Sequence, residues 1–425
     1  MQSGKGKGGV ARRRVLKGAT ALSAVAAVGG FPAILKAQQG GVIKVGMPTI
    51  LSGRVAILGQ SSVGGAMSVI RKFNEAGGID GRKIELVVRD SKGKPDEAAR
   101  VARDLVNNDG CAMLLDGEAS SGSFAVQEVV RDLGVLCVHT ASEASSLTAD
   151  PKIRVPTAFR AVRQGIHDAV GGGEYAAKLA KDHGVKKWMA CSPDYAYGRE
   201  NTEQFMEYAR HFDSSIELVD QTWPKLLQPD YTENITKILQ VQPDAVYSAL
   251  WGGDLAAFID QAALYGLFDQ FETVAVNLGD YPVLTAVKNL PEGVHSGSRY
   301  NAEVPDTSEN EAWYKEYRAN NDHLPTNWSW ESATGAAMMI EALRRTGGDT
   351  SGKKLAEAMK DLTIDSPFGV DGKLTMRGED HTLINYVVGY GVTIAKEPYI
   401  KDFVYSSWDQ ILELEKDWKK RKGYI

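Results

Sequence analysis

Short apolar runs alternate along most of the chain with segments whose apolar residues recur at helical spacing. The runs predict strands at 42–47, 84–88, 112–115, 135–138, 187–191, 217–219, 245–247 and 273–276. Residues 95–106 illustrate the helical segments, because Pro95 precedes apolar side chains at i, i+3, i+4, i+7 and i+8. Further helices are expected after residue 59 and at 165–182, 329–346 and 351–361. This alternation predicts parallel sheets with helices on both faces.

The rhythm changes near the C-terminus. Residues 386–392 favour a strand, and residues 408–421 favour either a charged amphipathic helix or an irregular tail. The chain has 425 residues, enough for two α/β domains, and no segment rich in proline, glycine and serine separates them. We therefore expect the chain to pass between the two domains more than once, through ordered segments.

The first 37 residues have the layout of a bacterial export signal. Arg12, Arg13 and Arg14 precede a weakly apolar, alanine-rich run, and Ala37 offers the small residue that a signal peptidase prefers. The arginine pair indicates the twin-arginine route, which leads to the periplasm. The run is interrupted by glycine and proline, so stable membrane insertion after cleavage is not expected. A basic tail or a retained anchor is the alternative.

Removal of this leader changes the charge of the chain. Residues 1–37 hold seven of the 49 basic side chains and none of the 54 acidic ones, so the remainder has 42 basic and 54 acidic side chains. A formal net charge of −12 is unfavourable for binding nucleic acid or an anionic membrane surface. The pattern therefore predicts an extracytoplasmic protein without a nucleic-acid partner.

The sequence gives little support for catalysis or for a metal site. Cys111, Cys137 and Cys191 are too few for a disulfide framework, and no Cys-x-x-Cys motif is present. Cys111 and Cys137 fall in expected neighbouring strands, where two buried free thiols are favoured over a bridge. The seven histidines are scattered, and hydrolase motifs are absent. We expect neither a cofactor nor a metal, no catalytic residues, and no enzymatic activity.

Polar and aromatic residues gather in loops that follow the predicted strands. In open α/β sheets a ligand binds beyond the carboxyl ends of the strands, so these loops are where a site is expected. One of them contains the hydroxyl-rich helix start at Ser120 and Ser121, whose free backbone N–H groups suit a carboxylate. The loops lie at 51–59, 116–123, 139–143, 192–198 and 251–254. Together they predict a binding cleft.

The sequence over residues 41–400 resembles the solute-binding proteins of branched-chain amino acid ABC transporters, of the leucine/isoleucine/valine-binding type. The order and spacing of several phrases carry the resemblance. They are Leu51-Ser52-Gly53, Leu58-Gly59, Asn74-Glu75-Ala76-Gly77-Gly78-Ile79-Asp80-Gly81, Ala119-Ser120-Ser121, Pro193-Asp194-Tyr195-Ala196-Tyr197-Gly198 and Ser366-Pro367-Phe368-Gly369.

The resemblance implies an α/β fold of two Rossmann-like lobes joined by three crossovers, the type I periplasmic binding protein architecture. It places residues 41–161 and 298–370 in lobe 1, and residues 162–297 and 371–425 in lobe 2. It also implies hinge closure on a small ligand and delivery to the permease subunits of an ABC transporter. A ligand sensor for a membrane receptor has the same fold and is the alternative.

The resemblance further assigns roles to individual residues. It implies that Ser120 holds the ligand carboxylate, that the backbone carbonyl of Ala141 faces the ligand ammonium, and that Tyr197 covers the ligand from lobe 2. Trp251 matches a second-lobe tyrosine of the family, and Leu58 matches an aromatic residue of the first loop.

Two positions depart from the family pattern. Glu143 stands where the family has threonine, and the glutamate that binds the ammonium aligns near Leu278 and is missing. A buried ammonium needs an anion, so either Glu143 or Asp280 supplies it from a shifted position, or the ligand is not an α-amino acid. We expect an amino acid or a related amide or carboxylate. Aromatic acids and urea remain open.

Overall fold

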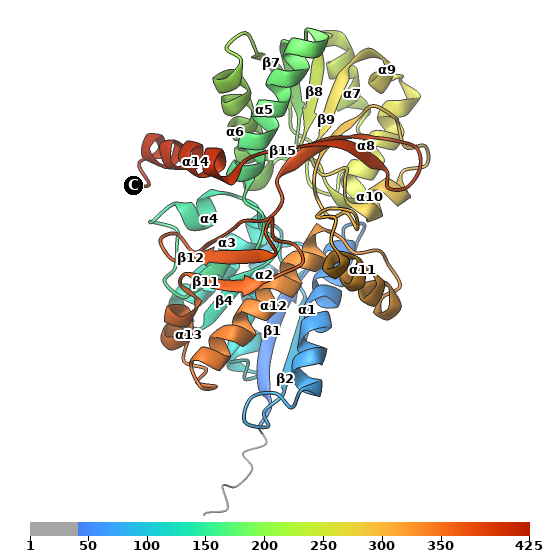
Figure 1. Cartoon of the computed structure of the whole chain (residues 1–425). Helices are drawn as coiled ribbons and strands as arrows, with labels where there is room; N and C mark the ends of the chain where they lie inside the picture. The colour runs from blue at the N-terminus through green and yellow to red at the C-terminus, as the bar shows by residue number, and fades with distance from the viewer. Residues whose placement is uncertain (1–40) are drawn as a thin grey trace, which may run out of the picture. The chain divides into compact units, whose positions relative to one another are not determined.

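The computed structural model describes residues 41–425, and the expected export signal lies outside the described residues. Two mostly parallel sheets with helices on their faces form this part of the chain (Figure 1). The α/β fold class is therefore confirmed. Among the described helices, none combines the length and the apolar character that crossing a membrane requires.

The first sheet has eight strands in the order β11-β12-β13-β5-β4-β3-β1-β2. All pairs from β2 to β13 are parallel, whereas β11, β12 and β13 form an antiparallel meander at one edge. The strands are β1 (Ile43–Thr49), β2 (Ile84–Asp90), β3 (Met113–Asp116), β4 (Leu136–His139), β5 (Ala158–Arg160), β11 (Leu362–Asp365), β12 (Lys373–Arg377) and β13 (Thr382–Ile384).

The second sheet has seven strands in the order β15-β14-β10-β9-β8-β6-β7. Its strands β6 to β10 pair in parallel, and β14 and β15 add an antiparallel edge. The strands are β6 (Lys187–Cys191), β7 (Glu217–Thr222), β8 (Ala245–Ser248), β9 (Glu272–Ala275), β10 (His295–Gly297), β14 (Gly389–Thr393) and β15 (Ile400–Tyr405).

Helices cover the faces of both sheets (Figure 1). Beside the first sheet are α1 (Ile57–Glu75), α2 (Pro95–Asn107), α3 (Ser120–Leu133), α4 (Ser146–Ala149), α11 (Ser308–Asn320), α12 (Asn327–Arg345) and α13 (Gly352–Met359). Beside the second are α5 (Gly165–His183), α6 (Ala196–Phe212), α7 (Thr232–Val241), α8 (Gly252–Leu264), α9 (Leu267–Gln270), α10 (Tyr281–Ala286) and α14 (Trp408–Lys422).

Close packing of helix pairs explains glycines within the helices. A Cβ at Gly65 in α1 would come within 1.9 Å of the carbonyl oxygen of Ser329 in α12. Likewise, a Cβ at Gly173 in α5 would lie 2.5 Å from the backbone of Tyr208 in α6. Gly65 and Gly173 thus let two helix backbones approach directly, so they serve helix packing.

The chain passes between the two sheets three times within residues 41–425: between β5 and β6, between β10 and β11, and between β13 and β14. The expectation of repeated crossing is confirmed. The expected return of the chain to lobe 2 at residue 371 is wrong, because β12 and β13 hydrogen-bond to the first sheet. β12 continues the antiparallel meander that begins with β11. The chain crosses to the second sheet only after Ile384, the last residue of β13.

The three cysteines are buried free thiols, as expected for the pair Cys111 and Cys137. Burial raises the pKa of Cys111 to about 11, so this thiol stays protonated at neutral pH. Cys137 lies in β4, opposite Leu114 of the adjacent β3. All residues of β3 and β4 are buried, which explains their continuous apolar runs.

The C-terminal helix α14 is fixed to the first sheet by a buried ion cluster. Arg377 of β12 donates to both carboxylate oxygens of Glu415, at 2.7 and 2.8 Å. Lys419 lies 2.6 Å from Asp380 and 3.1 Å from Glu415, and His167 of α5 lies 3.3 Å from Glu415. Burial disfavours ionised Glu415, but its contacts with His167 and then with Arg377 outweigh burial and hold the pKa of Glu415 well below its usual value.

Replacement of Glu415 by glutamine tests this cluster. Glu415→Gln removes one carboxylate and leaves two buried cations sharing Asp380, so we expect the free energy of unfolding at pH 7 to fall by about 3 kcal/mol. The stability from Glu415 is fully present above its unfolded pKa and is lost as the pH falls through its lower folded pKa. The difference from wild type, measured by urea unfolding, should therefore shrink below pH 4.5. A difference that stays constant from pH 7 to pH 3 would contradict this account.

Candidate functional site

A cavity lies between the lobes at the carboxyl ends of strands from both sheets. It holds about 290 Å³ of space not occupied by atoms and is partly open to solvent. Lobe 1 lines it after β3 and β4 and from α1 and α12, and lobe 2 after β6, β8, β9 and β10. The lining residues are Leu58, Ala119, Ser120, Ala141, Glu143, Tyr195, Tyr197, Trp251, Asn277, Arg299 and Trp328.

Most of the expected site residues meet at this cavity. Six of them line it: Leu58, Ser120, Ala141, Glu143, Tyr197 and Trp251. Ser121 and Asp280 are not among the lining residues. Ser121 occupies the next position of α3 and is half-buried.

Asp280 is fully buried next to the cavity rather than in its wall. One of its carboxylate oxygens accepts a hydrogen bond of 2.8 Å from the backbone N–H of Asn327, the first residue of α12. Burial raises the pKa of Asp280, and Arg299 opposes that rise. Asp280 thus joins a lobe 2 loop to a lobe 1 helix start, which is a different place from the one expected for an ammonium partner.

Ser120 forms one polar corner of the cavity at the start of α3. The preceding residue, Ala119, is extended and ends the loop after β3, so Ser120 opens the helix and its N–H groups lack intrahelical acceptors. The Ser120 hydroxyl accepts from the N–H of Ala144 at 3.4 Å, which leaves its own proton to donate. A hydroxyl donor and a helix N-terminus together favour an anionic oxygen.

Four aromatic side chains form the apolar walls. Trp251 of lobe 2 meets Trp328 of lobe 1 edge to face, with ring centroids 5.6 Å apart. Trp251 donates through Nε1 to the hydroxyl of Tyr195 at 2.8 Å, and Asn277 donates through Nδ2 to the hydroxyl of Tyr197 at 2.8 Å. These bonds fix the rings, so the cavity presents flat apolar surfaces in set orientations.

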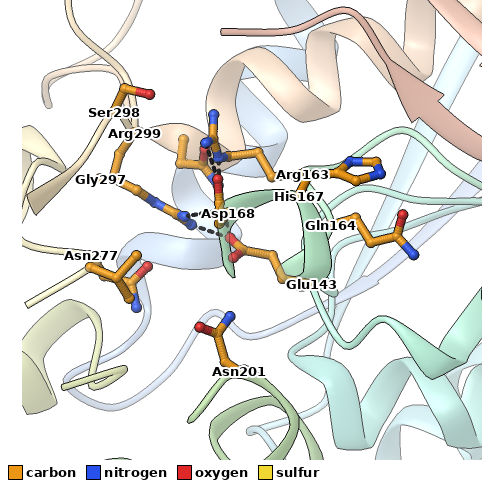
Figure 2. A network of polar contacts seen from close by, with 12 residues as sticks. Glu143, Arg163, Gln164, His167, Asp168, Asn201, Asn277, Gly297, Ser298 and Arg299 are labelled. Atoms are coloured by element: carbon orange, nitrogen blue, oxygen red, sulfur yellow. Dashed lines mark hydrogen bonds and ion pairs between the residues drawn. The ribbon is translucent and has the colours of Figure 1, made fainter. Parts of the chain in front are cut away.

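A second polar corner is formed by Glu143 and Arg299, which are ion-paired. Figure 2 shows the carboxylates of Glu143 and Asp168 both turned toward the guanidinium of Arg299. Arg299 lies 3.1 Å from Asp168, which also pairs with Arg163. Arg163 donates to the carbonyl of Val387 at 2.7 Å.

Burial and neighbouring charges shift the pKa values of both Glu143 and Arg299. Burial raises the pKa of Glu143, although the charge of Arg299 opposes that rise. Burial also disfavours charged Arg299, but Glu143 and Asp168 outweigh it and hold the pKa of Arg299 well above its usual value. The Oε1 atom of Glu143 accepts from Asn327 at 3.2 Å, whereas Oε2 has no hydrogen-bond partner within residues 41–425. One acceptor atom at the cavity is therefore left for a ligand.

Sequence reasoning missed several lining residues. Ala119 and Tyr195 lie within phrases that marked the family resemblance, and Asn277 is adjacent to Leu278, where the family glutamate aligns. Leu278 itself is buried in the core. Arg299 follows β10, and Trp328 lies in the first turn of α12. No motif near either residue indicated the cavity. A strand of three residues such as β10 is too short to be recognised from its sequence pattern, so the loop after it could not be predicted as part of the site.

Further contacts join the lobes around the cavity. Arg54, in the loop before α1, lies 2.6 Å from Asp254 of α8 and also donates to the carbonyl of Gln228. Ser146 of α4 donates to Glu200 of α6 through its N–H and its hydroxyl. These bonds require the lobes to be close together. Within residues 41–425, no group of three or more His, Cys, Asp or Glu side chains is arranged to hold a metal ion.

Comparison with known proteins gives consistent results. Residues 42–396 match the family described as Periplasmic binding protein. The leucine-, isoleucine-, valine-, threonine-, and alanine-binding protein of Pseudomonas aeruginosa is 24% identical over 375 residues, which are 86% of this chain and 95% of that protein. Leu/Ile/Val-binding protein homolog 4 of Brucella abortus is 23% identical over 362 residues, which are 80% and 81% of the two chains.

Solved structures show the same fold. The solute binding protein of an ABC transporter from Rhodopseudomonas palustris BisB5, in complex with 3,4-dihydroxy benzoic acid, aligns with a TM-score of 0.76. Its identity to this chain is 22%, and the alignment covers 86% of this chain and 96% of that one. The cavity between two α/β lobes and the match over residues 42–396 identify the class of protein. The chain belongs to the periplasmic binding protein family. Membership supports a periplasmic protein that binds a small molecule.

Two substitutions test the cavity as the ligand site. Ser120→Ala removes a hydroxyl donor, and Trp251→Ala removes an aromatic wall. We expect each to raise the ligand dissociation constant about tenfold or more in calorimetry, because a hydrogen bond to a charged group contributes about 1.5–3 kcal/mol. Ser121→Ala, one residue along the same helix but outside the cavity wall, is the control and should bind as wild type does. Unchanged affinity in Ser120→Ala and Trp251→Ala would refute the assignment.

The pair Arg54 and Asp254 provides a test of lobe closure. Arg54 is one-third exposed, so we expect a modest coupling of about 0.2–1 kcal/mol with Asp254, detected as ligand affinity in a double-mutant cycle. Arg54→Ala and Asp254→Asn should each weaken binding, and the double variant should lose less than the sum of the two. Strictly additive losses would show that the ion pair does not contribute to the bound, closed form.

Proposed function

We propose that the chain captures a small carboxylate with a flat aromatic body between its lobes and delivers it to an ABC transporter. The observation that carries this proposal is the set of four aromatic side chains that line the same cavity as Ser120. The start of α3 and the Ser120 hydroxyl suit the carboxylate, and the rings of Trp251 and Trp328 suit an aromatic face.

The relative from Rhodopseudomonas palustris supports this ligand class, since its complex contains 3,4-dihydroxy benzoic acid. Its identity to this chain is low, so the support comes from the shared fold together with the aromatic walls seen here.

An α-amino acid is the second candidate ligand. The unpartnered Oε2 of Glu143 favours it, because a carboxylate oxygen on a side chain that lines the cavity is an acceptor for an ammonium. The Pseudomonas aeruginosa relative is named for five amino acids of this kind. The ion pair of Glu143 with Arg299 argues in the other direction, since the charge of Glu143 is already neutralised.

The proposal includes the route and the partner. Residues 1–37 would direct export through the twin-arginine system, and the closed, loaded form would dock on the permease subunits of the transporter. Binding and release, without chemical change of the ligand, is the proposed activity. A membrane receptor that reads the same closed form would make the chain a sensor instead. Neighbouring permease and ATPase genes favour transport, and a neighbouring kinase or cyclase gene favours sensing.

A thermal-shift screen on residues 38–425, followed by calorimetry, tests the ligand class. The panel contains benzoate, 4-hydroxybenzoate, 3,4-dihydroxybenzoate, leucine, isoleucine, phenylalanine and urea. A ligand at about 100 times its dissociation constant should add about 2.7 kcal/mol of stability and raise the melting temperature. We expect the aromatic carboxylates to give the largest shifts. A response to the amino acids alone would support the second candidate, and no response to any compound would reject both.

A further inference from the structure

Glu143 and Arg299 are the only two charged residues in the wall of the cavity, counted over residues 41–425. They carry opposite charges and are paired with each other. The side chain of Arg299 is 1% exposed and that of Glu143 is 4% exposed, so little water screens either one. A ligand therefore meets a polar corner with no net charge.

A second carboxylate also holds Arg299 in place. Its guanidinium also binds Asp168 of α5 at 3.1 Å, and Asp168 is held by Arg163. Arg163 reaches the carbonyl of Val387, so the network connects all three segments that cross between the lobes. Arg299 therefore stays beside Glu143 and is not free to move away when a ligand arrives.

Two other buried carboxyl groups face the same cluster. Burial raises the pKa of Asp280, and it raises the pKa of Glu331 well above its usual value. Burial therefore works against ionisation of both acids, and the carboxylates that pair with Arg299 are those of Glu143 and Asp168.

An α-ammonium group would have to share the Glu143 carboxylate with Arg299. That arrangement places two cations on one buried anion, and the repulsion between them is weakly screened. A ligand hydroxyl needs only the free Oε2 as an acceptor and brings no charge. The geometry thus favours a neutral hydrogen-bond donor over an ammonium at this corner.

We propose that Arg299 is a specificity-determining residue that excludes α-ammonium groups, so that the cavity takes carboxylates bearing an uncharged hydroxyl. This inference rests on the proposed function and specifies which group the same site accepts beside the carboxylate. Arg299 neutralises Glu143 and turns a potential ammonium site into an acceptor for hydroxyl groups. The expected ligands are hydroxy acids, with the hydroxyl on the chain or on a ring.

Matched ligand pairs test the inference directly. Leucine is compared with 2-hydroxy-4-methylpentanoate, and phenylalanine with 3-phenyllactate, because each pair differs in the ammonium and hydroxyl groups alone. Calorimetry with the mature wild-type chain should give tighter binding of the hydroxy acid in each pair, by about tenfold or more. Tighter binding of the amino acid by wild type would overturn the inference.

Two substitutions should move this preference in opposite directions. Arg299→Met leaves Glu143 without its counterion, so the ratio of dissociation constants should shift about tenfold or more toward the amino acids. Glu143→Gln leaves Arg299 with excess positive charge, so the ratio should shift further toward the hydroxy acids. Arg299→Lys retains the cation and should retain the wild-type preference.

The control is Arg377→Met, which breaks another buried ion cluster away from the cavity. It should lower the melting temperature without altering the ratio between matched ligands, and circular dichroism checks the fold of every variant. Failure of wild type to bind any carboxylate would reject the proposed function itself. Binding by wild type with a ratio that neither Arg299→Met nor Glu143→Gln changes would reject only the role of Arg299.

Discussion

The buried ion pairs of Arg163 and Arg299 with Asp168 and Glu143 join the parts of this protein that must act together. Each removes charge from water at a cost of several kcal/mol per ion, so the pairs need close partners and good geometry to persist. Their partners come from both lobes and from the crossing segments. The network therefore connects both lobes and the crossing segments, and it reaches the wall of the cavity through Glu143 and Arg299.

The cavity follows from the topology that the network connects. Parallel strands bring their carboxyl ends to one edge of each sheet, and the loops after β3, β4, β6, β8, β9 and β10 all contribute to its wall. Because two sheets face each other across the crossings, residues far apart in the sequence, such as Trp251 and Trp328, come into contact. The fold determines where side chains meet, and the side chains determine what they bind.

The parallel cores could be predicted from the sequence because their signals are local. Continuous apolar runs identified β3 and β4, and the stripe after Pro95 identified α2. The meander of β11 to β13 escaped prediction, since its short strands are half-exposed and pair at a sheet edge. The meander joins the sheet through the pairing of β13 with β5, about 220 residues away, and no local pattern records that contact.

The residues of the site likewise divide into those that could be predicted from the sequence and those that could not. Ser120, Tyr197 and Trp251 follow strands that were themselves predictable, and all three line one cavity. Arg299 follows a strand of three residues, and its partner Glu143 stands where the family has threonine. Glu143 and Arg299 belong together physically, because a buried glutamate requires a cation beside it. Neither residue alone explains this polar corner of the cavity. The ion pair between them explains why both are present.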